Sequence, residues 1–166
     1  MSRAFVKEQG TEPADTLGEL PLSPHPNYVT RRGLVLLRAR QEQAQRRLAA
    51  LPRDAFGAEM GQARLERELR WLAARIGGAI PVDPARQPAD RVAFGAMVEL
   101  TDANSGAAHR YRIVGEDQAD PEHGLVSWIS PLARALNGAR VGDIVAWPRP
   151  AGDLELEVLK IGYPAD

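Results

Sequence analysis

The sequence predicts an α+β protein in which an N-terminal antiparallel helical hairpin precedes an antiparallel sheet domain with one short helix. Apolar residues recur at alternating spacings of three and four between residues 34 and 76, the heptad pattern of two paired helices. After three prolines between residues 81 and 88, the pattern changes to short alternating runs separated by turns. We therefore expect an N-terminal arm (1–27), a hairpin (28–80), a linker (81–91) and a sheet domain (92–166).

Residues 1–27 contain four prolines among glycines and acidic residues, a composition that resists both helix and sheet. We expect a flexible or extended arm here. In the block Ser23-Pro24-His25-Pro26, each residue that precedes a proline is pushed out of the α region. The first helix is therefore expected only after this block.

The hairpin is predicted from two heptad seams and the signals at their ends. Thr30 is a good N-cap for the first helix. Pro52 and Gly57 interrupt the pattern with a turn, and Gly77-Gly78 ends the second helix. Two helices of about 20 residues make a hairpin about 30 Å long. The seams consist of Leu34, Leu37, Gln41, Ala44, Leu48 and Leu51, then Leu65, Leu69, Leu72 and Ile76.

The C-terminal half has the alternation and turn residues of a sheet domain. One short helix interrupts the strands: Ser130 can cap it, Pro131 suits its first position and Gly138 can end it. The expected strands are 92–100, 109–114, 125–129, 144–147 and 154–161.

Composition excludes several classes of function. The 166 residues contain no Cys, which excludes disulfides, a thiolate nucleophile and a Cys-based metal site. No run approaches the ~20 apolar residues of a membrane helix, and the N-terminus lacks the apolar core of a signal peptide. The three histidines lack the spacing of a metal site. We expect a cytoplasmic protein with no membrane partner and no stand-alone metal centre.

Charge divides the chain into regions of opposite sign. Residues 30–80 hold eleven Arg and five acidic residues, whereas residues 81–166 hold eight basic and thirteen acidic residues. A basic hairpin suits a polyanion or an acidic protein cavity, and the alternative is a solvated helix face. Aromatic residues are absent from the basic stripe, which argues against base stacking there. The predicted basic surface comprises Arg38, Arg46, Arg47, Arg64 and Arg67.

Four motifs behind the hairpin carry a family resemblance. They are Val92-Ala93-Phe94-Gly95-Ala96-Met97-Val98, the run Tyr111-Arg112-Ile113-Val114-Gly115-Glu116-Asp117-Gln118-Ala119-Asp120, Ser130-Pro131-Leu132-Ala133-Arg134-Ala135-Leu136 and Val141-Gly142-Asp143. In this order, after a hairpin that begins Tyr28-Val29-Thr30-Arg31-Arg32-Gly33, the chain resembles the bacterial Gre transcript-cleavage factors over residues 28–163.

The resemblance implies an FKBP-like sheet domain that docks at the rim of the secondary channel of RNA polymerase, and a hairpin that enters the channel. The implied docking residues are Ser130, Pro131, Leu132 and Arg134. Ile129 stands where the family tends to have Asp or Asn, which makes the expected contacts more apolar.

The predicted hairpin tip departs from the family. In Gre factors the tip carries a Gly-Asp-Leu-x-Glu-Asn-like motif, whose acidic residues help to hold a catalytic Mg²⁺ at the polymerase active site. The present sequence does not contain this motif. The predicted hairpin is also shorter than the hairpin of the family, by on the order of 10 Å. Asp54 and Glu59 are the acidic candidates for Mg²⁺ shared with the polymerase, and the alternative for Asp54 is a helix N-cap.

The function implied is that of a transcription elongation factor, with no catalytic residues and no tightly bound cofactor of its own. The resemblance implies that it binds RNA polymerase, works beside the nascent RNA 3′ end and assists cleavage of backtracked RNA. A DNA-binding role is also implied. The alternative is a non-cleaving regulator of the same channel. A prolyl isomerase and a coiled-coil interaction module are remote alternatives. The turn from Pro52 to Gly57 favours pairing of the seams within one chain, so we expect a monomer.

Overall fold

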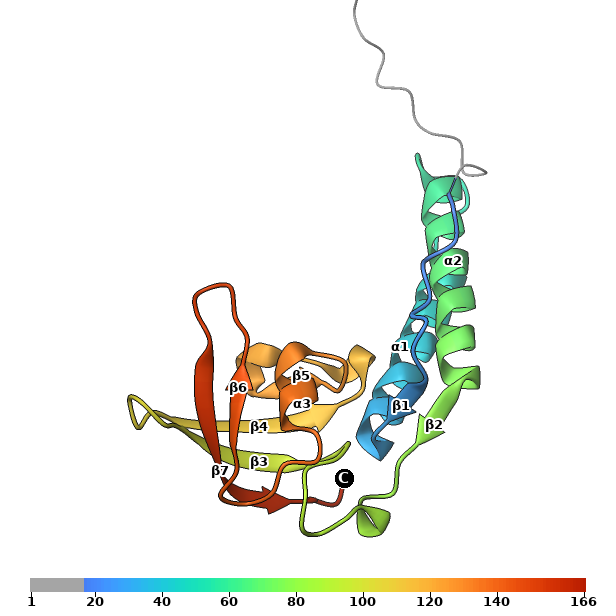
Figure 1. Ribbon diagram of the computed structural model, residues 1–166. Helices are drawn as coiled ribbons and strands as arrows, with labels where there is room; N and C mark the ends of the chain where they lie inside the picture. Colours follow the sequence, from blue (N-terminus) through green and yellow to red (C-terminus); the bar gives the residue numbers. More distant parts are fainter. Residues whose placement is uncertain (1–16) are drawn as a thin grey trace, which may run out of the picture.

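The computed structural model describes residues 17–166, and it confirms the predicted α+β class (Figure 1). The expected arm falls partly outside this range, so its flexibility over residues 1–16 stays a prediction. Residues 17–26 contain no helix or strand and lie along the hairpin.

The hairpin consists of α1 (Arg31–Ala49) and α2 (Ala58–Gly77), joined by a turn. The predicted signals at its ends are confirmed. The Thr30 hydroxyl accepts a hydrogen bond from the Gly33 N–H at 2.9 Å, and Gly78 follows the last residue of α2. Gly57, with φ of 78°, turns the chain into α2 in a conformation that L side chains rarely adopt.

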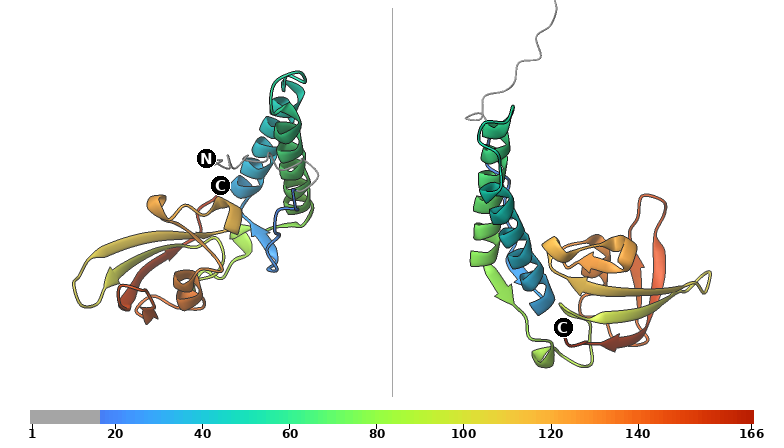
Figure 2. Two further views of the ribbon diagram at one scale, coloured as in Figure 1. Left: turned by 90° about the horizontal axis from the view of Figure 1, so that it is seen from above. Right: turned by 180° about the vertical axis from the view of Figure 1, so that it is seen from behind.

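The two seams pack against each other within the chain. Leu37 and Ala44 of α1 and Leu65 and Leu72 of α2 are buried, and Leu72 has no exposed surface. Figure 2 shows from above and from behind that the tip of this hairpin points away from the sheet domain. Among the described helices, none is long and apolar enough to cross a membrane.

A short parallel pair of strands closes the base of the hairpin. β1 (Asn27–Val29) pairs with β2 (Ala79–Pro81), and Asn27 lies opposite Ala79. The sequence did not predict this pair, because three-residue strands are too short to show an alternating pattern. A 3₁₀ turn (Pro84–Arg86) follows within the expected linker.

The sheet domain has five strands in the order β5-β4-β3-β7-β6. Its helix, α3 (Pro131–Leu136), begins as predicted: the Ser130 hydroxyl accepts from the Ala133 N–H at 3.2 Å. Leu132 and Leu136 of this helix pack into a core with Val98, Leu100 and other strand residues. The strands are β3 (Met97–Asp102), β4 (Ala108–Val114), β5 (Leu125–Ser127), β6 (Ile144–Trp147) and β7 (Leu154–Gly162).

Two details of the predicted sheet are wrong. The sheet is mixed, because β5 runs parallel to β4, whereas the other three pairings are antiparallel as expected. The chain between β4 and β5 passes through two 3₁₀ turns (Glu116–Gln118 and Pro121–His123). These turns bring it back along β4, so that β5 runs beside β4 in the same direction. The first strand also begins at Met97, not at residue 92, because Gly95 adopts φ of 87° and ends any extended run before it.

Candidate functional site

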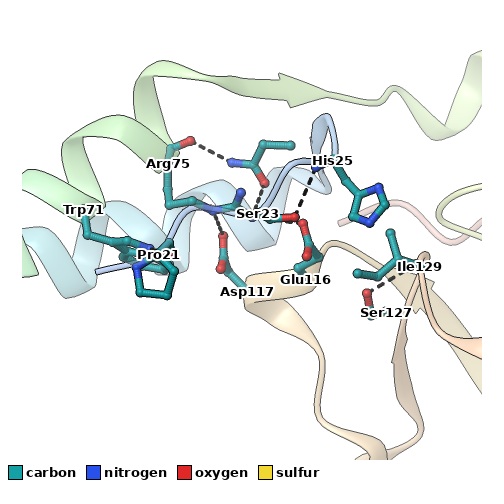
Figure 3. Close-up of polar contacts among 10 residues, drawn as sticks. Pro21, Ser23, His25, Trp71, Arg75, Glu116, Asp117, Ser127 and Ile129 are labelled. Carbon is teal, nitrogen blue, oxygen red and sulfur yellow. Dashed lines mark hydrogen bonds and ion pairs between the residues drawn. The ribbon is translucent and has the colours of Figure 1, made fainter. Parts of the chain in front are cut away.

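The base of the hairpin is fixed to the sheet domain by a buried arginine. Arg75 of α2 is 5% exposed, and its Nε donates to Asp117 Oδ2 at 2.7 Å (Figure 3). Its Nη2 donates to Asn27 Oδ1 at 2.7 Å and lies 3.5 Å from Glu116 Oε2. The Asn27 Nδ2 returns a hydrogen bond to the Arg75 carbonyl oxygen at 2.7 Å. One guanidinium therefore joins the hairpin, β1 and the turn after β4.

Two further contacts complete this junction. The Thr30 hydroxyl, which caps α1, donates to Gln118 Oε1 at 2.6 Å across 88 residues of sequence. Gly115 passes so close to β1 that a Cβ there would lie 2.5 Å from the Tyr28 carbonyl oxygen. The junction therefore requires glycine at residue 115, and it sets the direction in which the hairpin points.

The predicted docking segment divides into exposed and buried residues. Pro131 and Arg134 are exposed on α3, whereas Leu132 is 2% exposed and faces the core. Ser130 is half-buried and its hydroxyl is used by the helix cap. Of the four predicted residues, Pro131 and Arg134 are thus available to a partner, and Ser130 and Leu132 hold the helix that presents them.

An aromatic pocket that the sequence did not predict lies beside this segment. Its cavity of about 340 Å³ is lined by Tyr28, Phe94, Trp128, Arg134 and Asn137, among others. The rings of Tyr28 and Trp128 meet edge to face, with centroids 5.1 Å apart. Three aromatic side chains from separate parts of the sequence converge here, so no local pattern could have predicted the pocket.

The tip does not bring the predicted acidic pair into a metal site. Asp54 and Glu59 are both exposed, and within residues 17–166 neither side chain makes an ion pair or a hydrogen bond. Glu59 lines a hollow with Gln62 and Glu66, and Asp54 is not part of that lining. In the described part of the chain, no three His, Cys, Asp or Glu residues gather as a metal site. The chain's own residues therefore do not fit a complete Mg²⁺ site.

The alternative prediction that Asp54 caps the second helix is wrong. The N-cap of α2 is Gly57, which makes no side-chain hydrogen bond. The tip instead presents Phe56, whose side chain is fully exposed at 102% of its reference surface. An aromatic residue next to a glycine in a polar turn was the signal that could have indicated this exposure.

The predicted basic surface is present, although part of it is covered. Arg38, Arg46, Arg47 and Arg64 are exposed. Arg46 pairs with Glu42 at 3.1 Å on the same helix. Arg67 is half-buried, and its Nη1 donates to the Gly18 carbonyl oxygen at 3.2 Å. The arm therefore reaches the basic surface, a contact that the sequence did not predict.

Comparison with known proteins identifies the family. The model of the GreA/GreB transcription elongation factor C-terminal domain matches residues 87–163. The transcription elongation factor GreA of Nautilia profundicola is 38% identical over 127 residues, which cover 75% of this chain and 78% of the relative. GreB of Xanthomonas axonopodis pv. citri is 38% identical over 136 residues, which cover 77% and 81%. The chain belongs to the GreA/GreB family.

One further relative matches this Gre-family chain over a shorter span. GreA of Alkalilimnicola ehrlichii is 42% identical over 103 residues, and the chain spans 65% of its length. Among solved structures, GreA factor homolog 1 of Thermus thermophilus is 25% identical, with 82% of this chain and 99% of that chain covered and a TM-score of 0.41. The matched range of the Gre family model contains Pro131, Arg134 and most of the aromatic pocket.

Proposed function

We propose that this Gre-family chain binds RNA polymerase at the secondary channel. In this proposal the sheet domain docks at the rim of the channel, and the hairpin enters it. The exposed Pro131 and Arg134 and the neighbouring aromatic pocket supply an apolar and positively charged docking surface. Aromatic and arginine side chains beside a pocket are the usual anchors of a protein interface.

We further propose that the chain regulates transcription by obstructing the channel and does not assist RNA cleavage. The observation that carries this proposal is the tip: a fully exposed Phe56 occupies its end, and the two nearby carboxylates do not gather into a metal site. A phenyl ring has no oxygen atom to ligate Mg²⁺ and no group that activates water. A rod of helices about 30 Å long that ends in an apolar ring can fill space in a channel.

The competing hypothesis is assisted cleavage, with Asp54 and Glu59 adding ligands to a Mg²⁺ ion that the polymerase holds. Both hypotheses share the docking surface and differ only at the tip. The decisive experiment measures RNA release from stalled, backtracked elongation complexes of the cognate polymerase with Mg²⁺. A pull-down of the polymerase serves as the binding control.

We expect binding without faster cleavage, and we expect slower nucleotide addition that Phe56→Ser relieves while binding is kept. Faster cleavage that Asp54→Ala or Glu59→Ala abolishes would establish the competing hypothesis. Absence of binding, or binding that an Arg134→Glu change in α3 leaves intact, would overturn the proposed docking.

A further inference from the structure

After β7 the chain returns to the base of the hairpin. Residues 163–166 follow this strand and reach the start of α1, beside which Figure 1 marks the C-terminus. The Tyr163 hydroxyl donates to the Arg91 carbonyl oxygen at 2.6 Å and so holds the beginning of this segment to the linker. The side chain of Asp166 is only 4% exposed, although the residue as a whole lies at the surface. We call residues 163–166 the C-terminal strap.

The Asp166 carboxylate joins the hairpin to the sheet domain with both of its oxygens. Its Oδ2 accepts a hydrogen bond from the Arg31 N–H at 2.8 Å, and Arg31 is the first residue of α1. Its Oδ1 accepts from Arg112 Nη2 on β4 at 2.6 Å. The first N–H groups of a helix have no partner within the helix and favour a nearby negative charge. Asp166 therefore supplies an acceptor to the hairpin and a counter-ion to the sheet at the same time.

The Arg112 guanidinium depends on this carboxylate. The Arg112 side chain is 12% exposed, and within residues 17–166 Asp166 is the one residue that forms an ion pair with it. Its Nε is buried and has no hydrogen-bond partner in the same range. Removing one partner of a buried ion pair leaves a charge that its surroundings do not compensate. Loss of the Asp166 carboxylate would thus act on β4 as well as on α1.

The strap holds the hairpin at a place that the Arg75 junction does not reach. The ion pairs of Arg75 and the hydrogen bond from Thr30 all end on one 3₁₀ turn, Glu116–Gln118. Polar contacts that end on a single turn allow a rigid rod to swing about that turn as a hinge. The hydrogen bond from α1 to Asp166 ends on a different segment. Two separate attachments fix a direction, whereas one attachment leaves it free.

We propose that Asp166 is a positioning residue that fixes the direction of the hairpin relative to the sheet domain. Neither apolar core contains Asp166 or Arg112, so both domains should stay folded when the strap is released, and the hairpin should swing about the Glu116–Gln118 turn. The consequence for transcription rests on the proposed function, in which the tip points into the channel while the sheet domain is docked. A hairpin that samples several directions would obstruct the channel for only part of the time.

The first test measures the direction of the hairpin. The chain has no cysteine, so nitroxides on Arg47→Cys in α1 and Asn104→Cys in the turn after β3 report one distance between the domains, by double electron–electron resonance. We expect a narrow distance distribution in the parent protein and a broader or shifted one in Asp166→Asn. Asparagine has one acceptor oxygen where the carboxylate has two, and its NH₂ group would face a donor.

A matched control and a reciprocal variant complete this test. Asp153→Asn removes an exposed carboxylate that makes no ion pair within residues 17–166, and it should leave the distribution unchanged. Arg112→Gln should broaden the distribution as Asp166→Asn does, and the double variant should broaden it no further, because the two side chains act through one contact. Far-UV circular dichroism checks that each variant is folded. Unchanged distances in Asp166→Asn and Arg112→Gln, or effects that add in the double variant, would overturn the proposal.

The second test separates this role from the proposed function. With the cognate polymerase, Asp166→Asn should still bind in the pull-down, and it should slow nucleotide addition about two- to fivefold less than the parent protein. A changed distance distribution with undiminished slowing would overturn the proposed obstruction of the channel and would keep Asp166 as a positioning residue. An unchanged distribution would overturn the role of Asp166 whatever the effect on transcription.

Discussion

The two ends of the hairpin differ in how they meet their surroundings. At the base, Arg75 is almost fully buried and joined to Asp117 and Asn27, and Gly115 leaves no room for a side chain. At the tip, Phe56 is fully exposed, and within the described residues nothing pairs with Asp54 or Glu59. The base therefore fixes the direction of the hairpin, and the tip is left for a partner. Substitutions at the base should change stability, and substitutions at the tip should change function.

The largest expected effect is at the buried arginine. Arg75→Ala leaves Asp117, Glu116 and Asn27 without their cation, and removing one partner of a buried ion pair is strongly destabilising. We expect a loss of about 2 to 4 kcal/mol in the free energy of unfolding, measured by urea denaturation. Arg46→Ala, which removes an exposed pair, is the control and should cost less than about 1 kcal/mol. Equal losses in the two variants would contradict a special role for the base.

Two glycine substitutions should change the stability of the protein in opposite directions. Gly115→Ala forces a Cβ against the Tyr28 carbonyl and should destabilise the protein by about 1 to 3 kcal/mol. Gly77→Ala, in the last turn of α2, meets nothing within 4 Å and should stabilise it by up to about 1 kcal/mol. Thermal denaturation of both variants measures this difference. If Gly115→Ala left the stability unchanged, the junction between the hairpin and the sheet domain would have to be able to widen.

The arm should detach in acid. The hydrogen bond from Arg70 lowers the pKa of Glu19 below its ordinary value of 4.5, and Glu19 in turn raises the pKa of Arg70. Because the pKa of Glu19 is lower in the folded state, the contact is fully present above 4.5 and is lost as the pH falls through the lowered value. A nitroxide on Leu22→Cys should therefore gain mobility only in the acid range. In Glu19→Gln the label should already be mobile at neutral pH.

The smallest effect on stability is expected at the tip. Phe56→Ser removes a side chain that is fully exposed, so the free energy of unfolding should change by less than about 0.5 kcal/mol. The same urea denaturation measures it. A larger loss would mean that Phe56 packs against the chain in solution and would weaken its proposed role in the channel.

Local patterns determined the elements of this protein. Thr30 as a cap, the apolar seams, Gly78 after α2 and the Ser130-Pro131 start of α3 were all predicted correctly, because caps and periodicity act between residues within a few positions of each other. The family motifs of the sheet domain also lie in continuous runs, and they identified the family.

Only the tertiary structure decided how these elements meet. The parallel pairing of β5 with β4, the β1–β2 pair, the burial of Arg75, the aromatic pocket and the contact of Glu19 with Arg70 could not be predicted. Arg75 and Asp117 are 42 residues apart, and Glu19 and Arg70 are 51 apart. A local pattern contains no information about such partners, because an arginine on a helix looks the same in sequence whether it faces water or a distant carboxylate. The sequence by itself therefore determined the hairpin and the sheet domain, and the fold decided the direction of the hairpin and what covers its basic side.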